Sequence, residues 1–366
     1  MSEAERPARS RDSAYMRRAL SLAQKGWGQT APNPMVGAVV VRDGTVVGKG
    51  FHRRFGDAHA EVEALRAAGD RARGATVYVT LEPCNHHGKT PPCTDALLAA
   101  GVARVVCATR DPNPQAGGGV ERLRAAGVEV AVGVEASAAR ELNAPFFHAF
   151  VSDRPWVTLK LAVSLDSALA DATRSRGWLT NERSRREVHR LRAGHDAVGV
   201  GIGTAIADDP ALTVRAGRAP RVPPRRVVFD RLARLGTHSQ LARTAREVPV
   251  TVVAERPDPA RVALLEAAGV EVLVAATLPD ALRSLRRTGT RSMLVEGGAT
   301  LAGALLGAAL VDRLIIFRAP IVLGAGALPA FGTVPASPLA DAPRLPVVER
   351  RALGDDLMTV FAIRPP

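Results

Sequence analysis

The sequence lacks the long apolar runs that would place it in a membrane. Its longest candidate, residues 299–311, is shorter than the ~18 residues that a spanning helix needs, and glycine interrupts it. The first 13 residues are polar and contain no apolar segment of the kind found in secretory signals. These absences predict a soluble cytoplasmic protein that binds no membrane.

Cysteine is also scarce, with only Cys84, Cys93 and Cys107 in the chain. Three cysteines cannot build a disulfide framework, and a cytoplasmic chain would keep them reduced. Cys107 stands in an apolar run, so we expect it to be buried as a small hydrophobic residue. Metal binding is the alternative use for Cys84 and Cys93.

Aromatic residues make up only 4% of the chain, which leaves few platforms on which nucleic-acid bases could stack. The net charge of +13 nevertheless favours anionic partners, either nucleic acid or phosphorylated small molecules. Residues 1–150 carry 19 basic and 15 acidic residues, so most of the excess positive charge lies in the remainder. The scarcity of aromatic residues therefore favours a small phosphorylated ligand.

The length of 366 residues and the alternation of apolar patterns indicate two domains. In the first half we expect a three-layer α/β domain, with helices at 13–25, 59–68, 91–100 and 120–126 and strands at 36–41, 46–50, 75–81, 104–108 and 128–132. The pattern stops near 143–155, where Asn, Pro and Ser residues are typical of a linker. We place the domain boundary there, giving domains 1–148 and 149–366.

The second half has the pattern of another α/β domain. We expect helices at 184–193 and 301–310 and a Pro/Arg-rich loop at 215–226. Short apolar runs predict strands at 156–164, 197–201, 227–230, 250–254, 271–274 and 292–295.

The first half contains one group of residues of the types that ligate metals, placed near the predicted helices. His59 and Glu61 open one helix, and Cys84 and Cys93 follow a strand. One imidazole and two thiolates give zinc three protein ligands and leave the fourth position for water, whose pKa zinc lowers towards about 7. Glu61 can reach that water without ligating the metal, so it is a candidate proton shuttle.

The spacing of this group leaves an alternative open. Zinc nucleobase deaminases carry His-x-Glu and Pro-Cys-x-x-Cys, whereas eight residues separate the two cysteines here. The competing interpretations are a closed structural zinc site or two cysteines that are simply buried. A closed site needs a fourth ligand, which His86 or His87 could supply.

Longer motifs then make the sequence similar to a known family. The segments 30–37, His-Ala-Glu-Val at 59–62 and 80–93, which ends in Thr-Pro-Pro-Cys, resemble the deaminase half of the bifunctional riboflavin-biosynthesis deaminase/reductases. The longer loop between the cysteines is also a feature of that family. The resemblance implies a cytidine-deaminase-like fold, zinc on His59, Cys84 and Cys93, Glu61 as proton shuttle, and substrate contacts at Asn33, His52, His86 and Lys89.

In the second half, a glycine pair at 297–298 follows an apolar strand and precedes a predicted helix, an arrangement that lets backbone amides approach a diphosphate. It lacks the Gly-x-Gly-x-x-Gly pattern, so a standard Rossmann domain is not indicated. Together with 160–166, 178–180, 191–193, 203–215 and 320–324, however, this segment resembles the reductase half of the same family.

That resemblance implies a dihydrofolate-reductase-like α/β domain that uses NADPH. Lys160, on the first strand, either polarises the sugar carbonyl or imine or forms a structural ion pair. The implied cofactor contacts are Ala162, Trp178, Thr204, Asp208, Gly298, Ala299, Thr300 and Leu301. The implied substrate contacts are Arg176, Arg192, Leu212, Arg215 and Glu296.

Three positions depart from the family pattern: Ser167 and Arg174 replace glycines, and Arg176 replaces a serine. A serine is expected to disfavour the positive φ that glycine allows. Arg176 either adds a phosphate contact or obstructs the pocket.

Three hypotheses follow. The first is a zinc deaminase acting on 2,5-diamino-6-(5-phosphoribosylamino)-4(3H)-pyrimidinone, joined to an NADPH-dependent reductase that converts the ribosyl chain to ribityl. The others are a deaminase with a degenerate reductase domain and a nucleic-acid-editing deaminase. For the first hypothesis we expect no nucleic-acid partner and a homodimer or higher homo-oligomer.

Overall fold

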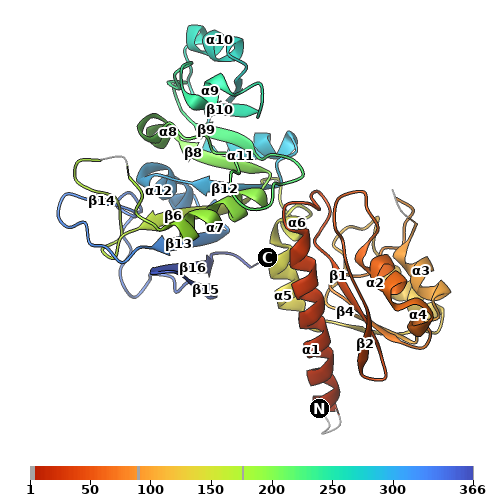
Figure 1. Cartoon of the computed structure of the whole chain (residues 1–366). Coiled ribbons are helices and arrows are strands. Elements are labelled where there is room, and N and C mark those ends of the chain that lie inside the picture. Colours follow the sequence, from red (N-terminus) through yellow and green to blue (C-terminus); the bar gives the residue numbers. More distant parts are fainter. Residues whose placement is uncertain (1–4, 89–90, 175–176, 366) are drawn as a thin grey trace. The chain divides into compact units, whose positions relative to one another are not determined.

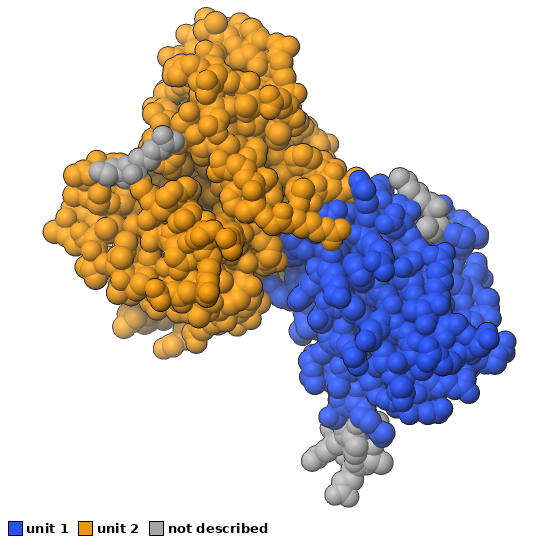
Figure 2. Space-filling model, in the orientation of Figure 1, with its two compact units in different colours: residues 1–151, 366 blue, residues 152–365 orange. Residues whose placement is uncertain are grey.

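A computed structural model describes residues 5–88, 91–174 and 177–365. By its internal contacts the chain forms two compact units, one ending at Val151 and the other beginning at Ser152 (Figure 2). The predicted boundary after residue 148 lies close to this division. No helix among the described residues combines the length and the apolar character needed to cross a bilayer.

The first unit is built on a five-stranded sheet (Figure 1). Strand β1 pairs antiparallel with both of its neighbours, and the remaining strands run parallel. Asp43 and Gly44 link β1 to β2 with positive φ values of 50° and 73°, as expected for a hairpin turn. The strand order is β2 (Thr45–Phe51), β1 (Gly37–Arg42), β3 (Thr76–Val79), β4 (Arg104–Cys107) and β5 (Glu129–Val132).

Helices cover both faces of this sheet, which confirms the predicted three layers. Val39 and Val41 of β1 pack with α1 on one face, whereas Val40 packs with α2 on the other, because side chains alternate along a strand. Cys107 is fully buried, as expected, in the hydrophobic core that contains Val40 and packs against α2. The helices are α1 (Glu5–Ala23), α2 (Ala60–Ala68), α3 (Cys93–Ala99), α4 (Gly119–Ala125), α5 (Ala136–Leu142) and α6 (Ala144–His148), with short 3₁₀ turns η1 (Gln24–Gly26) and η2 (Gly69–Ala72).

The segment expected to be a linker is partly helical, so that prediction was wrong for residues 144–148. Pro145 occupies the first turn of α6, where a missing N–H costs no helical hydrogen bond. The side chain of Asn143 also makes two hydrogen bonds with the backbone of Met35, at 2.8 and 2.9 Å. These contacts tie the segment to the first unit.

The second unit contains a nine-stranded sheet that is parallel except at one edge, where β16 and β15 pair antiparallel (Figure 1). Its order is β11 (Glu271–Val274), β10 (Val250–Ala254), β9 (Arg225–Phe229), β8 (Ala197–Gly201), β12 (Ser292–Glu296), β6 (Trp156–Val163), β13 (Arg313–Arg318), β16 (Asp356–Ala362) and β15 (Val347–Leu353). Strands β7 (Ala168–Ala170) and β14 (Leu328–Pro329) form a separate small pair.

Helices again cover both faces of the large sheet. Leu159 and Val295 pack with α11 and α12, Val200 and Val228 pack on the face that carries α9 and α10, and Phe317 packs with α7. Burial on both faces explains why the central strands are near-continuous apolar runs. The helices are α7 (Glu182–Ala193), α8 (Ile202–Asp208), α9 (Gln240–Arg243), α10 (Pro259–Ala267), α11 (Leu278–Arg287) and α12 (Ala299–Gly307).

Candidate active sites

Three candidate metal ligands converge in the first unit from separate elements. His59 precedes α2, Cys84 follows β3 and Cys93 is the first residue of α3. The Nδ1 atom of His59 lies 3.2 Å from Cys93 Sγ and 3.5 Å from Cys84 Sγ. All three ligand atoms lie within 4.8 Å of one another, a separation that one bound ion could bridge.

The group is open on one side. Within the described ranges, no further His, Cys, Asp or Glu joins the three ligands. The closed site considered from the sequence, completed by His86 or His87, is therefore not formed. Zinc sites with three protein ligands, in which water takes the fourth position, are catalytic rather than structural.

The chemistry of the donors fits zinc. A hydrogen bond from Cys93 and another with His59 lower the pKa of Cys84 to about 4, although burial acts in the opposite direction. The hydrogen bond with Cys84, together with burial, raises the pKa of Cys93. The two thiols thus share a hydrogen bond that favours the thiolate at Cys84 and the thiol at Cys93. Zinc prefers this set of one imidazole and two thiolates.

Glu61 lies beside these ligands in the first turn of α2. Glu61 is only 3% exposed, and this burial raises the pKa of its carboxyl group to about 7. His59 acts against the shift, and Cys84 adds to it. A carboxyl group with a pKa near neutrality can both accept and return a proton at pH 7. This is the property that the sequence-based proton-shuttle role requires.

A cavity of about 240 Å³ opens beside the ligands, and Asn33, His52 and His86, which the resemblance assigns to the substrate, are among its lining residues. His52 Nδ1 lies 3.2 Å from the carbonyl oxygen of Ala58, so it must donate, which leaves Nε2 to accept from Asn33 Nδ2 at 3.4 Å. Burial, and secondarily His59, lowers the pKa of His52. A neutral His52 thus orients the Asn33 amide. Lys89 lies outside the described residues.

Asp111 and Asn113 also line this cavity, and the sequence analysis did not select them. Burial, with contributions from Glu82 and Cys84, raises the pKa of Asp111 to about 6. A signal was present, because these residues follow β4, whose carboxyl end lies next to that of β3 in the parallel part of the sheet. Residues after neighbouring parallel strands meet at one edge.

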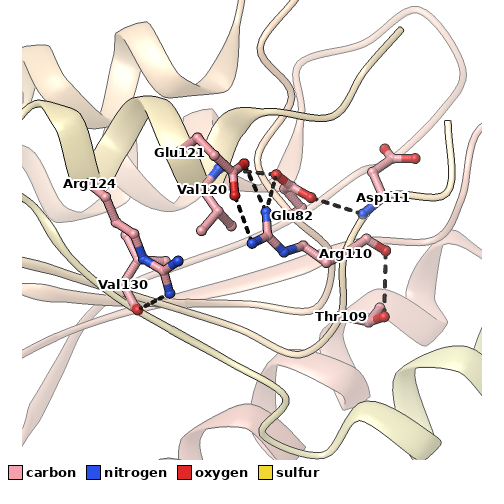
Figure 3. A network of polar contacts seen from close by, with 8 residues as sticks. All are labelled: Glu82, Thr109, Arg110, Asp111, Val120, Glu121, Arg124 and Val130. Carbon is pink, nitrogen blue, oxygen red and sulfur yellow. Dashed lines mark hydrogen bonds and ion pairs between the residues drawn. The ribbon is translucent and has the colours of Figure 1, made fainter. Parts of the chain in front are cut away.

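Glu82, two residues before Cys84, binds the loop after β4 that carries Asp111. Figure 3 shows this network around Glu82. Its side chain is 2% exposed and accepts hydrogen bonds from the backbone N–H of Val120 at 3.0 Å and of Asp111 at 3.2 Å. Arg110 donates to the same carboxylate at 3.3 Å and also pairs with Glu121. Glu82 therefore fixes Asp111 relative to Cys84.

The second unit contains a cleft of about 1690 Å³ near the carboxyl ends of β8, β9, β10 and β12. This edge of a parallel sheet is where α/β folds bind their ligands. Arg176 lies outside the described residues. Every other residue that the resemblance assigns to the reductase lines the cleft: Lys160, Ala162, Trp178, Arg192, Thr204, Asp208, Leu212, Arg215, Glu296, Gly298, Ala299, Thr300 and Leu301.

The glycine turn before α12 sits tightly against α8. A Cβ atom on Gly298 would lie 3.0 Å from Thr204 Oγ1, so glycine permits this close approach. The helix begins at Ala299, two residues earlier than predicted, which places Ala299, Thr300 and Leu301 in its first turn. The N–H groups of a first turn have no helical partners and favour an anion such as a diphosphate.

A buried charge cluster occupies the floor of the cleft. Burial opposes ionisation of Glu296, but Arg192 and Lys160 outweigh it and lower the pKa of that carboxyl group to about 2. Lys160 is the register partner of Glu296 across β6 and β12, and its Nζ lies 5.6 Å from the ring centroid of Phe317. Burial lowers the pKa of Lys160, while Glu296 acts against this shift.

The structural ion pair considered for Lys160 does not form with any described residue. Glu296 instead pairs with Arg192, whose NH2 group lies 3.0 Å from Oε2. Lys160 is therefore a half-buried amine whose strand position pairs it with Glu296, without an ion pair between them.

The departure at Ser167 does not disrupt the backbone turn, contrary to expectation. Ser167 adopts a φ of 62°, and its N–H donates to the carbonyl oxygen of Ser164 at 3.1 Å. The neighbouring hydrogen bond from Ala330 N to Ser167 O, at 2.9 Å, holds the strand pair β7–β14 at this point. These bonds stabilise a conformation that serine adopts less readily than glycine.

Comparison with known proteins matches both units. Residues 9–109 match the family of the cytidine and deoxycytidylate deaminase zinc-binding region, and residues 155–359 match the RibD C-terminal domain. The riboflavin biosynthesis protein RibD of Aquifex aeolicus is 42% identical, covering 96% of this chain and 98% of its own length. RibD of Escherichia coli is 44% identical over 94% of this chain and 98% of its own.

Solved structures agree with these matches. The deaminase/reductase of Thermotoga maritima superposes with a TM-score of 0.84 and 36% identity, covering 97% of this chain and 99% of its own. Acinetobacter baumannii RibD gives a TM-score of 0.83 and 38% identity with the same coverage. Neither the deaminase-only hypothesis nor the nucleic-acid-editing hypothesis gains support. The chain therefore belongs to the RibD family of bifunctional riboflavin-biosynthesis enzymes, which combine a zinc-dependent deaminase with an NADPH-dependent reductase.

Proposed function

We propose that the first unit removes an amino group from a phosphoribosylaminopyrimidine and that the second unit then reduces the sugar chain. The substrate is 2,5-diamino-6-(5-phosphoribosylamino)-4(3H)-pyrimidinone, and the products are the deaminated pyrimidine, ammonia and finally the ribityl compound. The observation that carries this proposal is the three-ligand group of His59, Cys84 and Cys93, of which His59 and Cys84 line one cavity together with Glu61.

In the first reaction, His59, Cys84 and Cys93 would hold zinc, which when bound would supply the Lewis acidity that activates water for attack on the ring carbon bearing the amino group. Glu61 accepts the proton from water and returns it to the departing amine, so that one water is consumed and one ammonia leaves. Asn33, His52 and His86 bind the pyrimidine and its sugar, and Lys89 binds the phosphate. The geometry that supports these roles is the common cavity shared by the described members of this set.

In the second reaction, NADPH supplies the hydride that reduces the sugar carbon. The first turn of α12 would hold the cofactor diphosphate together with Thr204 and Asp208, and Ala162 and Trp178 would contact the remainder. Arg176, Leu212 and Arg215 bind the substrate beside Arg192 and Glu296. Lys160 donates to the oxygen or nitrogen at the reacting carbon, since an amine with a lowered pKa gives up a proton readily.

We further propose that the chain works in the cytoplasm, where reducing conditions keep the Cys84 and Cys93 thiols available for metal. We propose a homodimer or higher homo-oligomer, the commonest assembly for such enzymes, and no nucleic-acid partner. Light scattering after gel filtration tests the assembly, and a monomer would contradict it. Retention on immobilised RNA at physiological salt would contradict the absence of a nucleic-acid partner.

A two-step assay on the purified chain tests the central proposal. Ammonia release should require zinc but no NADPH, and NADPH oxidation should require the deaminated product of the first step. Chelation should therefore stop ammonia release while leaving NADPH oxidation intact when the deaminated compound is supplied. Ammonia release that survives complete removal of metal would overturn the deaminase mechanism.

A further inference from the structure

His189 lines the reductase cleft from α7, but nothing so far assigns it a role. It faces the segment 211–215, which has no regular secondary structure and carries two of the proposed substrate contacts, Leu212 and Arg215. The backbone of such a segment must find partners outside a helix or sheet.

Three side chains hold this segment at alternate residues. Arg226 NH1 donates to the carbonyl oxygen of Ala211 at 3.3 Å, and Arg192 NH1 donates to that of Thr213 at 2.9 Å. The N–H of Arg215 donates to His189 Nδ1 at 3.2 Å. His189 and Arg192 are three residues apart on α7, so they face the segment from the same side of the helix.

The segment needs this support because its conformation is unusual. Leu212 has a φ of 52° although it is not glycine, and its side chain is 2% exposed. A leucine in the left-handed region persists only where the surroundings hold it there. Of the three hydrogen bonds, the one from Arg215 to His189 involves the backbone of Arg215 itself, so it acts most directly on the Arg215 side chain.

We propose that His189 is a positioning residue of the reductase: its ring nitrogen Nδ1 holds the backbone of Arg215, and thereby places the Arg215 side chain against the substrate. The proposal rests on the substrate contacts proposed above. It concerns the neutral ring, because a backbone N–H can only donate and a protonated Nδ1 cannot accept.

The surroundings of His189 favour that neutral form. Burial lowers the pKa of His189, and the neighbouring Arg192 and Arg215 lower it further, while Glu296 and the carbonyl of Thr213 act in the opposite direction. The acceptor is therefore present at neutral pH and is lost as the pH falls through this lowered pKa.

The test compares His189→Ala with His189→Asn in the full chain, and the NADPH affinity of each variant reports on the folding of the reductase unit. His189→Ala removes the acceptor and should raise the reductase KM for the deaminated substrate about 3- to 10-fold, the factor expected for one neutral hydrogen bond, with kcat and NADPH affinity little changed. His189→Asn offers an amide oxygen near the position of Nδ1 and should restore most of the KM.

Two further measurements separate positioning from a general structural role. The KM of the wild type should rise as the pH is lowered below 6.5, and the KM of His189→Asn should rise less, because asparagine does not titrate. Titration of the substrate phosphate affects both proteins equally, so the difference between them reports on His189. Amide hydrogen exchange across residues 211–216 should be faster in His189→Ala and near wild type in His189→Asn. An unchanged KM and exchange rate in His189→Ala would overturn the proposal.

The same experiments distinguish this proposal from the proposed function. If Arg215→Ala leaves KM unchanged, the assigned substrate contact at Arg215 fails, whereas faster exchange in His189→Ala still supports the holding role. If His189→Ala and His189→Asn raise KM equally, or both weaken NADPH binding, His189 acts on the fold of the cleft as a whole and the positioning role is wrong.

Discussion

Arg192 on α7 and Glu296 at the end of β12 bind each other at two points on the floor of the reductase cleft. Their side chains are only 10% and 13% exposed. From the sequence, each of the two residues is expected to contact the substrate separately. Each instead orients the other, so the carboxylate meets the cleft already ionised and in a fixed direction, and the remaining N–H groups of Arg192 are held in place for a substrate.

The ionisation of Glu296 predicts a specific pH dependence of stability. The pKa of this carboxyl group is about 2 in the folded chain and ordinarily 4.5. Its stabilising contribution is therefore complete above pH 4.5 and is lost progressively as the pH falls from there towards 2. Denaturant unfolding should show a steeper loss of stability over this range in the wild type than in Glu296→Gln. Parallel curves for the two proteins would contradict the assignment.

Loss of a cysteine ligand should abolish metal binding. Cys93→Ala leaves two donors, too few to hold zinc against dilution and dialysis, so we expect a zinc-to-chain ratio near zero and no ammonia release. Cys107→Ala is the matched control, because it removes a buried thiol that is not part of the ligand group, and it should retain its zinc. Elemental analysis of both variants decides the assignment. Undiminished zinc in Cys93→Ala would show that the ligand is misidentified.

Glu61→Gln should separate metal binding from proton transfer. The amide keeps the size of the side chain but cannot accept and return a proton, so we expect full zinc content with deamination slowed about 10²- to 10⁴-fold. NADPH oxidation with the deaminated compound should be unaffected, because that reaction uses the other unit. Deamination at the wild-type rate would refute the shuttle role.

Glu82→Gln tests whether the network of Figure 3 positions the substrate cavity. The amide can accept from Val120 or from Asp111 but faces the other N–H with a donor of its own, so the Asp111 loop should loosen. We expect the deaminase KM to rise about tenfold while zinc is retained, a factor in the range of one charge-assisted hydrogen bond. Glu121→Gln is the control: Glu121 is 60% exposed, and its loss should leave KM unchanged. Equal KM values in the two variants would contradict a positioning role for Glu82.

The layers and the metal ligands could be predicted from the sequence because their signals are local. A continuous apolar run marks β1, and short motifs mark His59 and Cys84, so neither depends on knowing the tertiary structure. The helix α6 was missed because Asn143 and Pro145 are as common in linkers as in first turns, and only the contact with Met35 distinguishes the two.

Relationships between distant residues could not be predicted in this way. Arg192 and Glu296 are 104 positions apart, and which of several cleft charges would pair depends on the register of β12 against β6. The positive φ of Ser167 was missed for a related reason, because its holding bond to Ala330 comes from a remote segment. Asp111 joined the metal cavity through the pairing of β3 with β4, which the motif search did not consider.

X-ray absorption at the zinc edge of the wild-type chain tests the central claim most directly. We predict two sulfur ligands from Cys84 and Cys93, one imidazole nitrogen from His59 and one oxygen from solvent. Adding a substrate analogue should change the zinc–oxygen distance and leave the sulfur and imidazole ligands in place. A shell of two sulfurs and two nitrogens, unchanged by the analogue, would describe a closed site and contradict a catalytic metal centre.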